Sequence, residues 1–223
     1  MNNYYLFFIL ITFFYIFNLF LLKNKILLDQ IESSKHKKFL VSESVPLSGG
    51  IFIFVALVVF VKDLSYLDKL LLSAIFFLGL LSDMQRLKSP IIRLFLQSLL
   101  ILIILIFNKN YISQTRLHYL DFLIENFFLI KFFFTLLCLL ILMNGVNFID
   151  GVNGLSTGYF IVILSNILFL SSNFDLKLNE DLIIIFLFLI IFYIFNMFSK
   201  SFLGDSGSYL LSVYFGLYLI SFF

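Results

Sequence analysis

The chain has 223 residues, of which 62% are hydrophobic and only 13% are charged, and its formal net charge is +2. A soluble domain carries about 25% charged residues, so this composition excludes an ordinary soluble globular protein and favours one whose solvent is the lipid bilayer. The small net charge argues against nucleic acid as a partner. The single cysteine, Cys138, excludes a disulfide framework and a thiolate metal site.

Eight mostly apolar runs predict membrane-spanning helices, because a span needs roughly 17–25 such residues. In chain order they cover residues 4–22, 47–61, 70–81, 91–107, 127–143, 155–170, 182–198 and 208–223. The second and third runs are short, and we expect these helices to extend into the polar residues beside them. The first run is long for a signal-peptide core and lacks a basic stretch before it, so we interpret it as a retained helix. The predicted fold is an all-α, polytopic transmembrane helix bundle of about eight helices, with residues 1–223 forming a single membrane domain.

The segment 108–126 interrupts this series and mixes aromatic with polar residues. It fits either a small hairpin or an interfacial helix, and nothing in it indicates chemistry. The lysine and arginine distribution predicts the orientation of the bundle, because cytoplasmic loops carry an excess of both residues. With the N-terminus outside, nine of the 15 basic residues fall on the inner side. We therefore expect a multi-pass protein of the inner (plasma) membrane with its N-terminus outside.

Polar residues gather in four segments, each lying between alternate predicted helices. The segments are HKKFLVSESVPLSGG (36–50), SDMQRLKSPIIR (82–93), NGVNFIDGVNG (144–154) and SFLGDSGS (201–208). Because the helices cross the membrane in alternating directions, all four segments emerge on the same face. This prediction holds for either orientation of the bundle.

The third segment contains a regular polar pattern. Asn144, Asn147, Asp150 and Asn153 recur every three residues, and glycines between them permit tight turns and close approach of a ligand. At helical periodicity these side chains would form one polar stripe at a helix end. Amide and carboxylate oxygens are ligands that suit a hard cation such as Mg²⁺.

The second and fourth segments place aspartates at helix ends. Asp83 ends the third helix and is followed by basic residues that include Arg93, while Asp205 lies between two glycines directly before the last helix. A lone aspartate such as Asp83 is more often a cap than a ligand, whereas capping and metal binding can coexist at Asp205. Lysines 35, 37 and 38 fit a topology signal or a contact with anionic lipid.

Carboxylates at membrane depth cost roughly 2.5–3.5 kcal/mol each and by default mark a functional site. Acidic groups for a metal beside basic groups for phosphates are what phosphoryl transfer requires. The four segments therefore predict a phosphoryl-transfer site on one face of the bundle.

The same motifs resemble the polyprenyl-phosphate N-acetylhexosamine-1-phosphate transferases (glycosyltransferase 4), which include phospho-N-acetylmuramoyl-pentapeptide transferase. NGVNFIDGVNGLSTG resembles the family signature N-x-x-N-x-x-D-G-x-D-G-L, and FLGDSGS is similar to its G-D-x-G-S segment. SDMQRLKSPIIRL resembles the D-D segment with its following Pro and Arg, and PLSGGIFIF the P-x-x-G-G that opens the second helix. The resemblance covers nearly the whole chain.

The resemblance implies transfer of N-acetylhexosamine 1-phosphate from a UDP-sugar to undecaprenyl (polyprenyl) phosphate, with release of UMP and a requirement for Mg²⁺. It also implies a cytoplasmic active face and a role in cell-wall or surface-polysaccharide biosynthesis. Within the site it implies a metal bound by Asp205 with help from Asn147, catalytic roles for Asp83 and Asp150, and substrate binding by the remaining polar residues. These substrate-binding residues are Lys38, Arg93, Asn144 and Asn153.

The sequence departs from the family pattern at three places. Ser82 stands where many members carry the first acid of the D-D pair, and Asn153 replaces the second acid of D-G-x-D-G. Members also continue through further helices and a histidine-rich loop, whereas here the histidines are His36 and His118. We therefore expect a truncated product, a fragment that needs a complementing C-terminal partner or a homodimer, or a reduced relative.

Two other classes of function remain as alternatives. One is a truncated, non-catalytic membrane scaffold or substrate-binding relative of the family, which the missing histidine loop favours and the intact aspartates disfavour. The other is an ion-coupled transporter, which would place its acidic residues at mid-membrane on broken helices. In this sequence the acidic residues lie at helix ends on one face, which disfavours a transporter.

Overall fold

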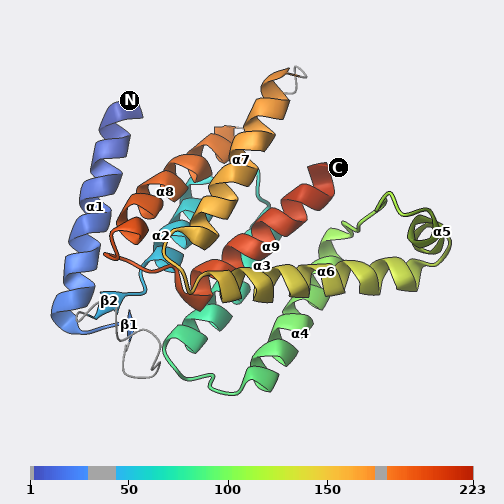
Figure 1. The fold of residues 1–223 in the computed structure, drawn as a ribbon, viewed down its shortest axis with the longest axis horizontal. Helices are drawn as coiled ribbons and strands as arrows, with labels where there is room; N and C mark the ends of the chain where they lie inside the picture. Colours follow the sequence, from blue (N-terminus) through green and yellow to red (C-terminus); the bar gives the residue numbers. More distant parts are fainter. Residues whose placement is uncertain (1–2, 30–43, 174–179, 223) are drawn as a thin grey trace.

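The computed structural model describes residues 3–29, 44–173 and 180–222, and Figure 1 shows a bundle built almost entirely of helices. In chain order the helices are α1 (Asn3–Asn24), α2 (Gly49–Val55), the π-helical η2 (Ala56–Phe60), α3 (Tyr66–Asp83), α4 (Pro90–Asn108), α5 (His118–Asn126), α6 (Phe128–Ile149), α7 (Leu155–Asn173), α8 (Glu180–Met197) and α9 (Gly204–Phe222). The strands β1 (Leu28–Asp29) and β2 (Val45–Pro46) pair antiparallel. The predicted all-α helical membrane bundle is confirmed.

The eight apolar runs all form helices, but their predicted ends need correction. The third helix extends into its polar flanks as expected, from Tyr66 to Asp83. The second does not: α2 and η2 together begin at Gly49, because Pro46 belongs to β2 and Leu47 donates its N–H to Leu27 O at 2.7 Å. The segment 108–126, for which two structures were open, contains the short helix α5.

Two serines start helices that lead toward or away from the polar face. Ser65 caps α3 by accepting a hydrogen bond from Asp68 N at 3.1 Å, and Ser89 caps α4, with Pro90 as the first helical residue. Serine is a preferred N-cap, and proline fits the first turn because its missing N–H would have no helical partner there. These caps fix where α3 begins and where the loop from Asp83 to α4 ends.

Helix α9 lies at the centre of the bundle and packs against α2, α3 and α6 (Figure 1). Its first three turns are buried, with Ser206 through Gly216 all enclosed. Small residues allow this close packing: a Cβ on Gly79 of α3 would lie 2.6 Å from Ser206 N, and one on Gly50 of α2 would lie 2.6 Å from Gly207 N. Close backbone contact through small residues is the usual way in which membrane helices associate.

Three helices in the described part of the chain are long and apolar enough to cross a membrane, judged by length and composition: α4, α6 and α8. Shorter apolar helices cover Phe8–Asn24, Gly49–Phe60 and Leu155–Ser171. Many large apolar side chains on the outside of the bundle are exposed, among them Phe95 of α4 at 64% and Ile141 of α6 at 62%. A surface of this kind is suited to contact with lipid rather than water.

Candidate active site

One cavity of about 570 Å³ lies where the predicted polar segments meet. Its lining residues come from β1 and β2, the end of α3, the end of α6 with its following loop, and the loop that leads into α9. They are Asp29, Val45, Leu47, Asp83, Asn147, Asp150, Gly151, Val152, Asn153, Ser199, Phe202, Gly204 and Asp205. The structure thus brings the second, third and fourth polar segments together with the described part of the first, residues 44–50, on one face of the bundle, as the alternation of helices predicted.

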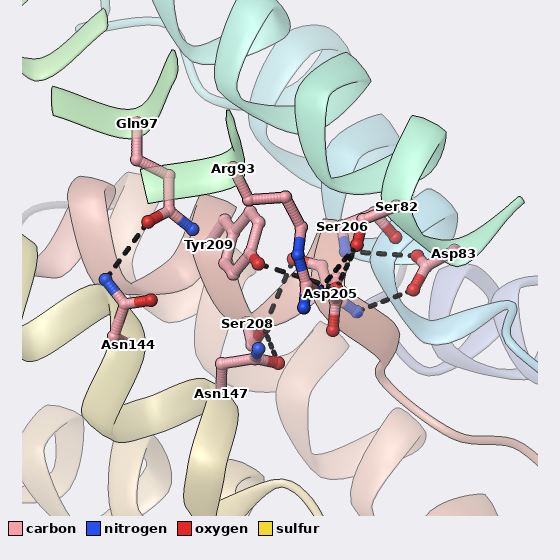
Figure 2. Close-up of polar contacts among 10 residues, drawn as sticks. All are labelled: Ser82, Asp83, Arg93, Gln97, Asn144, Asn147, Asp205, Ser206, Ser208 and Tyr209. Atoms are coloured by element: carbon pink, nitrogen blue, oxygen red, sulfur yellow. Dashed lines mark hydrogen bonds and ion pairs between the residues drawn. The ribbon is translucent and has the colours of Figure 1, made fainter. Parts of the chain in front are cut away.

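Asp83 joins the end of α3 to the start of α9. Its Oδ1 accepts a hydrogen bond from Asp205 N at 2.7 Å, and its Oδ2 accepts one from Ser206 N at 3.1 Å (Figure 2). The first N–H groups of a helix have no partner within the helix, and a carboxylate there also interacts favourably with the helix dipole. Gly204 has a φ of +75°, and a Cβ on it would lie 2.8 Å from Asp83 Oδ2, so this turn requires glycine. Asp83 therefore caps α9 rather than its own helix.

Asp205 lies in the first turn of α9, not before the helix as the sequence suggested. Its Oδ2 accepts hydrogen bonds from Ser82 Oγ of α3, from Arg93 NH1 of α4 at 2.9 Å and from Tyr209 OH of α9 at 3.4 Å (Figure 2). The contact with Arg93 is an ion pair in which the Arg93 side chain is 28% exposed and the Asp205 side chain is 22% exposed. Asp205 thus lines the cavity and accepts hydrogen bonds from side chains of α3, α4 and α9.

Asp150 follows the last residue of α6 and also lines the cavity. Burial raises the pKa of this carboxyl to about 7, and the nearby charges of Asp83 and Asp205 add to the increase. Hydrogen bonds from Ser156 Oγ and Gly204 N oppose it. Three carboxylates close enough to repel one another, in one partly dehydrated cavity, form a site that favours positive charge.

The polar stripe of the third segment does not stay on one face. Asn147 lines the cavity and accepts a hydrogen bond from Ser208 Oγ at 3.1 Å, and Asn153 lines it too, donating to Ser199 Oγ at 2.6 Å. Asn144 is one turn earlier in α6, is not among the lining residues, and donates to Gln97 Oε1 at 3.0 Å. A period of three falls short of the 3.6 residues of a helical turn, so each step rotates the side chain by about 60°. The expected single stripe is therefore wrong for Asn144.

The remaining predicted site residues are placed as follows. Arg93 reaches the site through its ion pair with Asp205, although it is not one of the residues that line the cavity. Lys38 lies outside the described residues.

Several residues of the site were not identified from the sequence. Asn196 of α8 is buried; its Oδ1 accepts a hydrogen bond from Gly154 N at 2.6 Å and its Nδ2 donates to Ser201 O at 2.9 Å, so it ties two of the converging loops together. A polar residue near the end of an otherwise apolar run was the signal for it. Tyr209 lies four residues, or one helical turn, after Asp205, and this spacing could also have been recognised in the sequence. Asp29 lines the cavity only because β1 pairs with β2, and the sequence held no sign of that pairing.

The donor atoms of the cavity can be compared with the needs of a divalent cation. In the described part of the chain no three His, Cys, Asp or Glu side chains are grouped closely enough to hold a metal by themselves. Mg²⁺ commonly uses only one or two carboxylates, together with water and substrate phosphates. Asp205, Asp150 and the amide oxygen of Asn147 all line the cavity and match that donor set.

Comparison with known proteins adds an independent finding. The model of a family described as glycosyl transferase family 4 matches residues 68–223. The match begins in the first turn of α3 and runs to the end of the chain. A search of curated proteins and a search of solved structures each gave no match. The matched region contains three of the four converging segments and all three carboxylates described above. Because the match extends over more than half of the sequence, the chain belongs to glycosyl transferase family 4, as the resemblance of its motifs predicted.

Proposed function

We propose that this protein transfers an N-acetylhexosamine 1-phosphate from a UDP-sugar to undecaprenyl or another polyprenyl phosphate and releases UMP. Family membership establishes a transferase in general terms. The observation that supports the finer proposal is the cavity, where Asp83, Asp150 and Asp205 meet two amide side chains at the ends of α3, α6 and α9 and Arg93 is ion-paired with Asp205 beside it. Its volume of about 570 Å³ falls within the usual range for small-molecule sites, about 300–1,000 Å³.

The proposed reaction exchanges one phosphoanhydride bond for another. An oxygen of the lipid phosphate attacks the phosphorus that bears the sugar, the bond from that phosphorus to the UMP oxygen breaks, and UMP leaves. The products are a lipid-diphosphate sugar and UMP. Because the attacking oxygen is already anionic in a phosphate, the protein has mainly to position the two substrates and to neutralise their charge.

The residues of the chain divide this work between them. Asp205 and Asn147 would hold Mg²⁺, which, when bound, neutralises the charge of the diphosphate. Asp83 keeps the first turn of α9 in place through its two hydrogen bonds, so that Asp205 stays in the lining of the cavity. Asp150 and Asn153, on the loop after α6, face the space where the nucleotide-sugar would lie.

The proposal predicts a reaction that purified protein performs alone. In nanodiscs containing undecaprenyl phosphate, it should release UMP from a UDP-N-acetylhexosamine, and chelation of divalent cations should stop the release. Chromatography of the nucleotide and mass spectrometry of the lipid product measure both sides of the reaction. Binding of the UDP-sugar without UMP release, under conditions where the lipid is present, would instead assign the chain to a non-catalytic, substrate-binding role.

We also propose that the protein resides in the inner membrane with its N-terminus outside and the cavity facing the cytoplasm. The excess of basic residues on the cavity side supports this orientation. Two positions at opposite ends of α3 provide a matched test: Tyr66, which is 95% exposed, and Arg86 in the loop after Asp83.

In a Cys138→Ser background, Tyr66→Cys should react with a membrane-impermeant thiol reagent added to intact cells, and Arg86→Cys should react only after the membrane is opened. The two variants lie at opposite ends of α3 and report on the two sides of the membrane. Labelling of Arg86→Cys but not Tyr66→Cys in intact cells would contradict the proposed orientation.

A further inference from the structure

The ion pair of Arg93 with Asp205 has a consequence for how the site binds a cation. In the described part of the chain, the three side chains that donate to Asp205 all reach the same oxygen, Oδ2. A carboxylate oxygen has two lone pairs, so three donors saturate it. Oδ1 is then the oxygen of Asp205 that remains for a metal.

Ser82 is part of the same arrangement. Its Oγ donates to Asp205 Oδ2 and accepts a hydrogen bond from Arg93 NH1 at 3.0 Å, so the serine hydroxyl bridges the arginine and the aspartate (Figure 2). A hydroxyl can donate and accept at the same time, whereas an ionised carboxylate can only accept. An acid at position 82 would compete with Asp205 for the guanidinium. The serine at this position therefore directs Arg93 to Asp205.

Arg93 is also in a position to move. Its side chain is 28% exposed, and it projects from the first turn of α4 across to the first turn of α9. A divalent cation bound at Asp205 would lie beside the guanidinium on the same carboxylate, and the long arginine side chain can relieve the repulsion between the two cationic groups by turning away. Guanidinium groups bind phosphate oxygens in bidentate fashion, so a phosphate beside the cation is an alternative partner of matched geometry.

We propose that Arg93 is a resident counter-ion of Asp205 that opposes cation binding and is handed over to a substrate phosphate when the cation binds. The identity of that phosphate as part of a nucleoside diphosphate rests on the proposed function. The opposition between Arg93 and the cation does not, because it follows from the contacts of Asp205 alone. Ser82 acts as a positioning residue, since it holds the guanidinium on Oδ2.

The test measures two affinities whose changes should have opposite signs. Without nucleotide, Arg93→Gln should bind Mn²⁺ about tenfold more tightly than the wild-type protein, because it removes the competing charge-assisted hydrogen bond. With Mn²⁺ saturating, the same variant should bind UDP about tenfold more weakly, because the phosphate loses its guanidinium partner. Electron paramagnetic resonance of free Mn²⁺ and calorimetry with UDP give the two values. A variant that merely damaged the fold would weaken both.

The loop before α4 provides a matched control. Arg86→Gln removes the same charge from an exposed position, so both affinities should stay within about twofold of wild type. Ser82→Ala changes the side-chain volume less than Arg93→Gln does. It should also strengthen Mn²⁺ binding, because it removes the hydroxyl that holds Arg93 on Asp205.

Unchanged or weaker Mn²⁺ binding in both Arg93→Gln and Ser82→Ala would overturn the proposal. Tighter Mn²⁺ binding with unchanged UDP affinity would overturn the handover to phosphate. If Arg93→Gln bound Mn²⁺ more tightly but the wild-type protein released no UMP, the counter-ion role of Arg93 would be supported and the proposed transferase reaction would be contradicted.

Discussion

Replacing Asp205 by asparagine is expected to lower UMP release by at least about a hundredfold. The substitution keeps the shape of the side chain and one acceptor oxygen, but it removes the negative charge that the proposed cation and Arg93 both require. Metal ions supply several kcal/mol of transition-state stabilisation, and each 1.36 kcal/mol is a factor of ten in rate. Because the Asp205 side chain is 22% exposed, we expect the fold to tolerate the change. The initial rate of UMP release and the melting temperature of the purified variant measure the two effects separately.

The matched control is Asp68→Asn, at the opposite end of α3. Asp68 accepts a hydrogen bond from Ser65 Oγ at 2.7 Å in the first turn of that helix, far along the helix from the cavity. Its neutralisation should leave the rate of UMP release within about twofold of wild type. Equal rates for the wild type and Asp205→Asn would show that Asp205 is not part of the catalytic site.

The presence of the helices and the shared face of the polar segments were largely predictable from the apolar runs. Eight apolar runs of near-spanning length gave eight helices, and their alternation placed four polar segments on one face. The ends of the helices were less predictable, since polar residues such as Asn147 and Asp205 belong to helical turns beyond the apolar runs. Hydrophobicity marks where a helix lies in lipid, whereas capping and tertiary contacts decide where it stops.

The contacts within the site were mostly not predictable. Asp83 was predicted to be a helix cap or a catalytic residue, but the helix that it caps was not predictable: its carboxylate accepts hydrogen bonds from two N–H groups of α9, which depends on how α3 and α9 pack. The departure at Ser82 was visible in the sequence, yet its bridging of Arg93 and Asp205 depends on three helices meeting at one point. The period of three grouped Asn144 with Asn147, Asp150 and Asn153. In the structure Asn144 lies one turn earlier in α6 and contacts Gln97 instead of the cavity.

Gly79→Ala is expected to be the most damaging small substitution in the helix core. Its Cβ would lie 2.6 Å from Ser206 N and 2.7 Å from Asp205 O, and these are backbone atoms of α9 that cannot rotate aside. The helices α3 and α9 must then separate, which also stretches the hydrogen bonds from α9 to Asp83. Overpacking of this kind costs about 1–3 kcal/mol, and loss of a buried charged hydrogen bond adds a similar amount. We expect a melting temperature lower by roughly 5–10 °C and loss of UMP release.

Gly145→Ala in α6 is the matched control, because it adds the same methyl group to another helical glycine. A Cβ at Gly145 has no atom within 4 Å, so the substitution introduces no clash. Alanine also favours a helix over glycine by about 1 kcal/mol, and we expect the melting temperature of this variant to be equal to or higher than that of the wild type. If both variants lowered the melting temperature equally, the damage would come from loss of glycine in a helix. A drop in melting temperature confined to Gly79→Ala would show that direct backbone contact between α3 and α9 stabilises the fold.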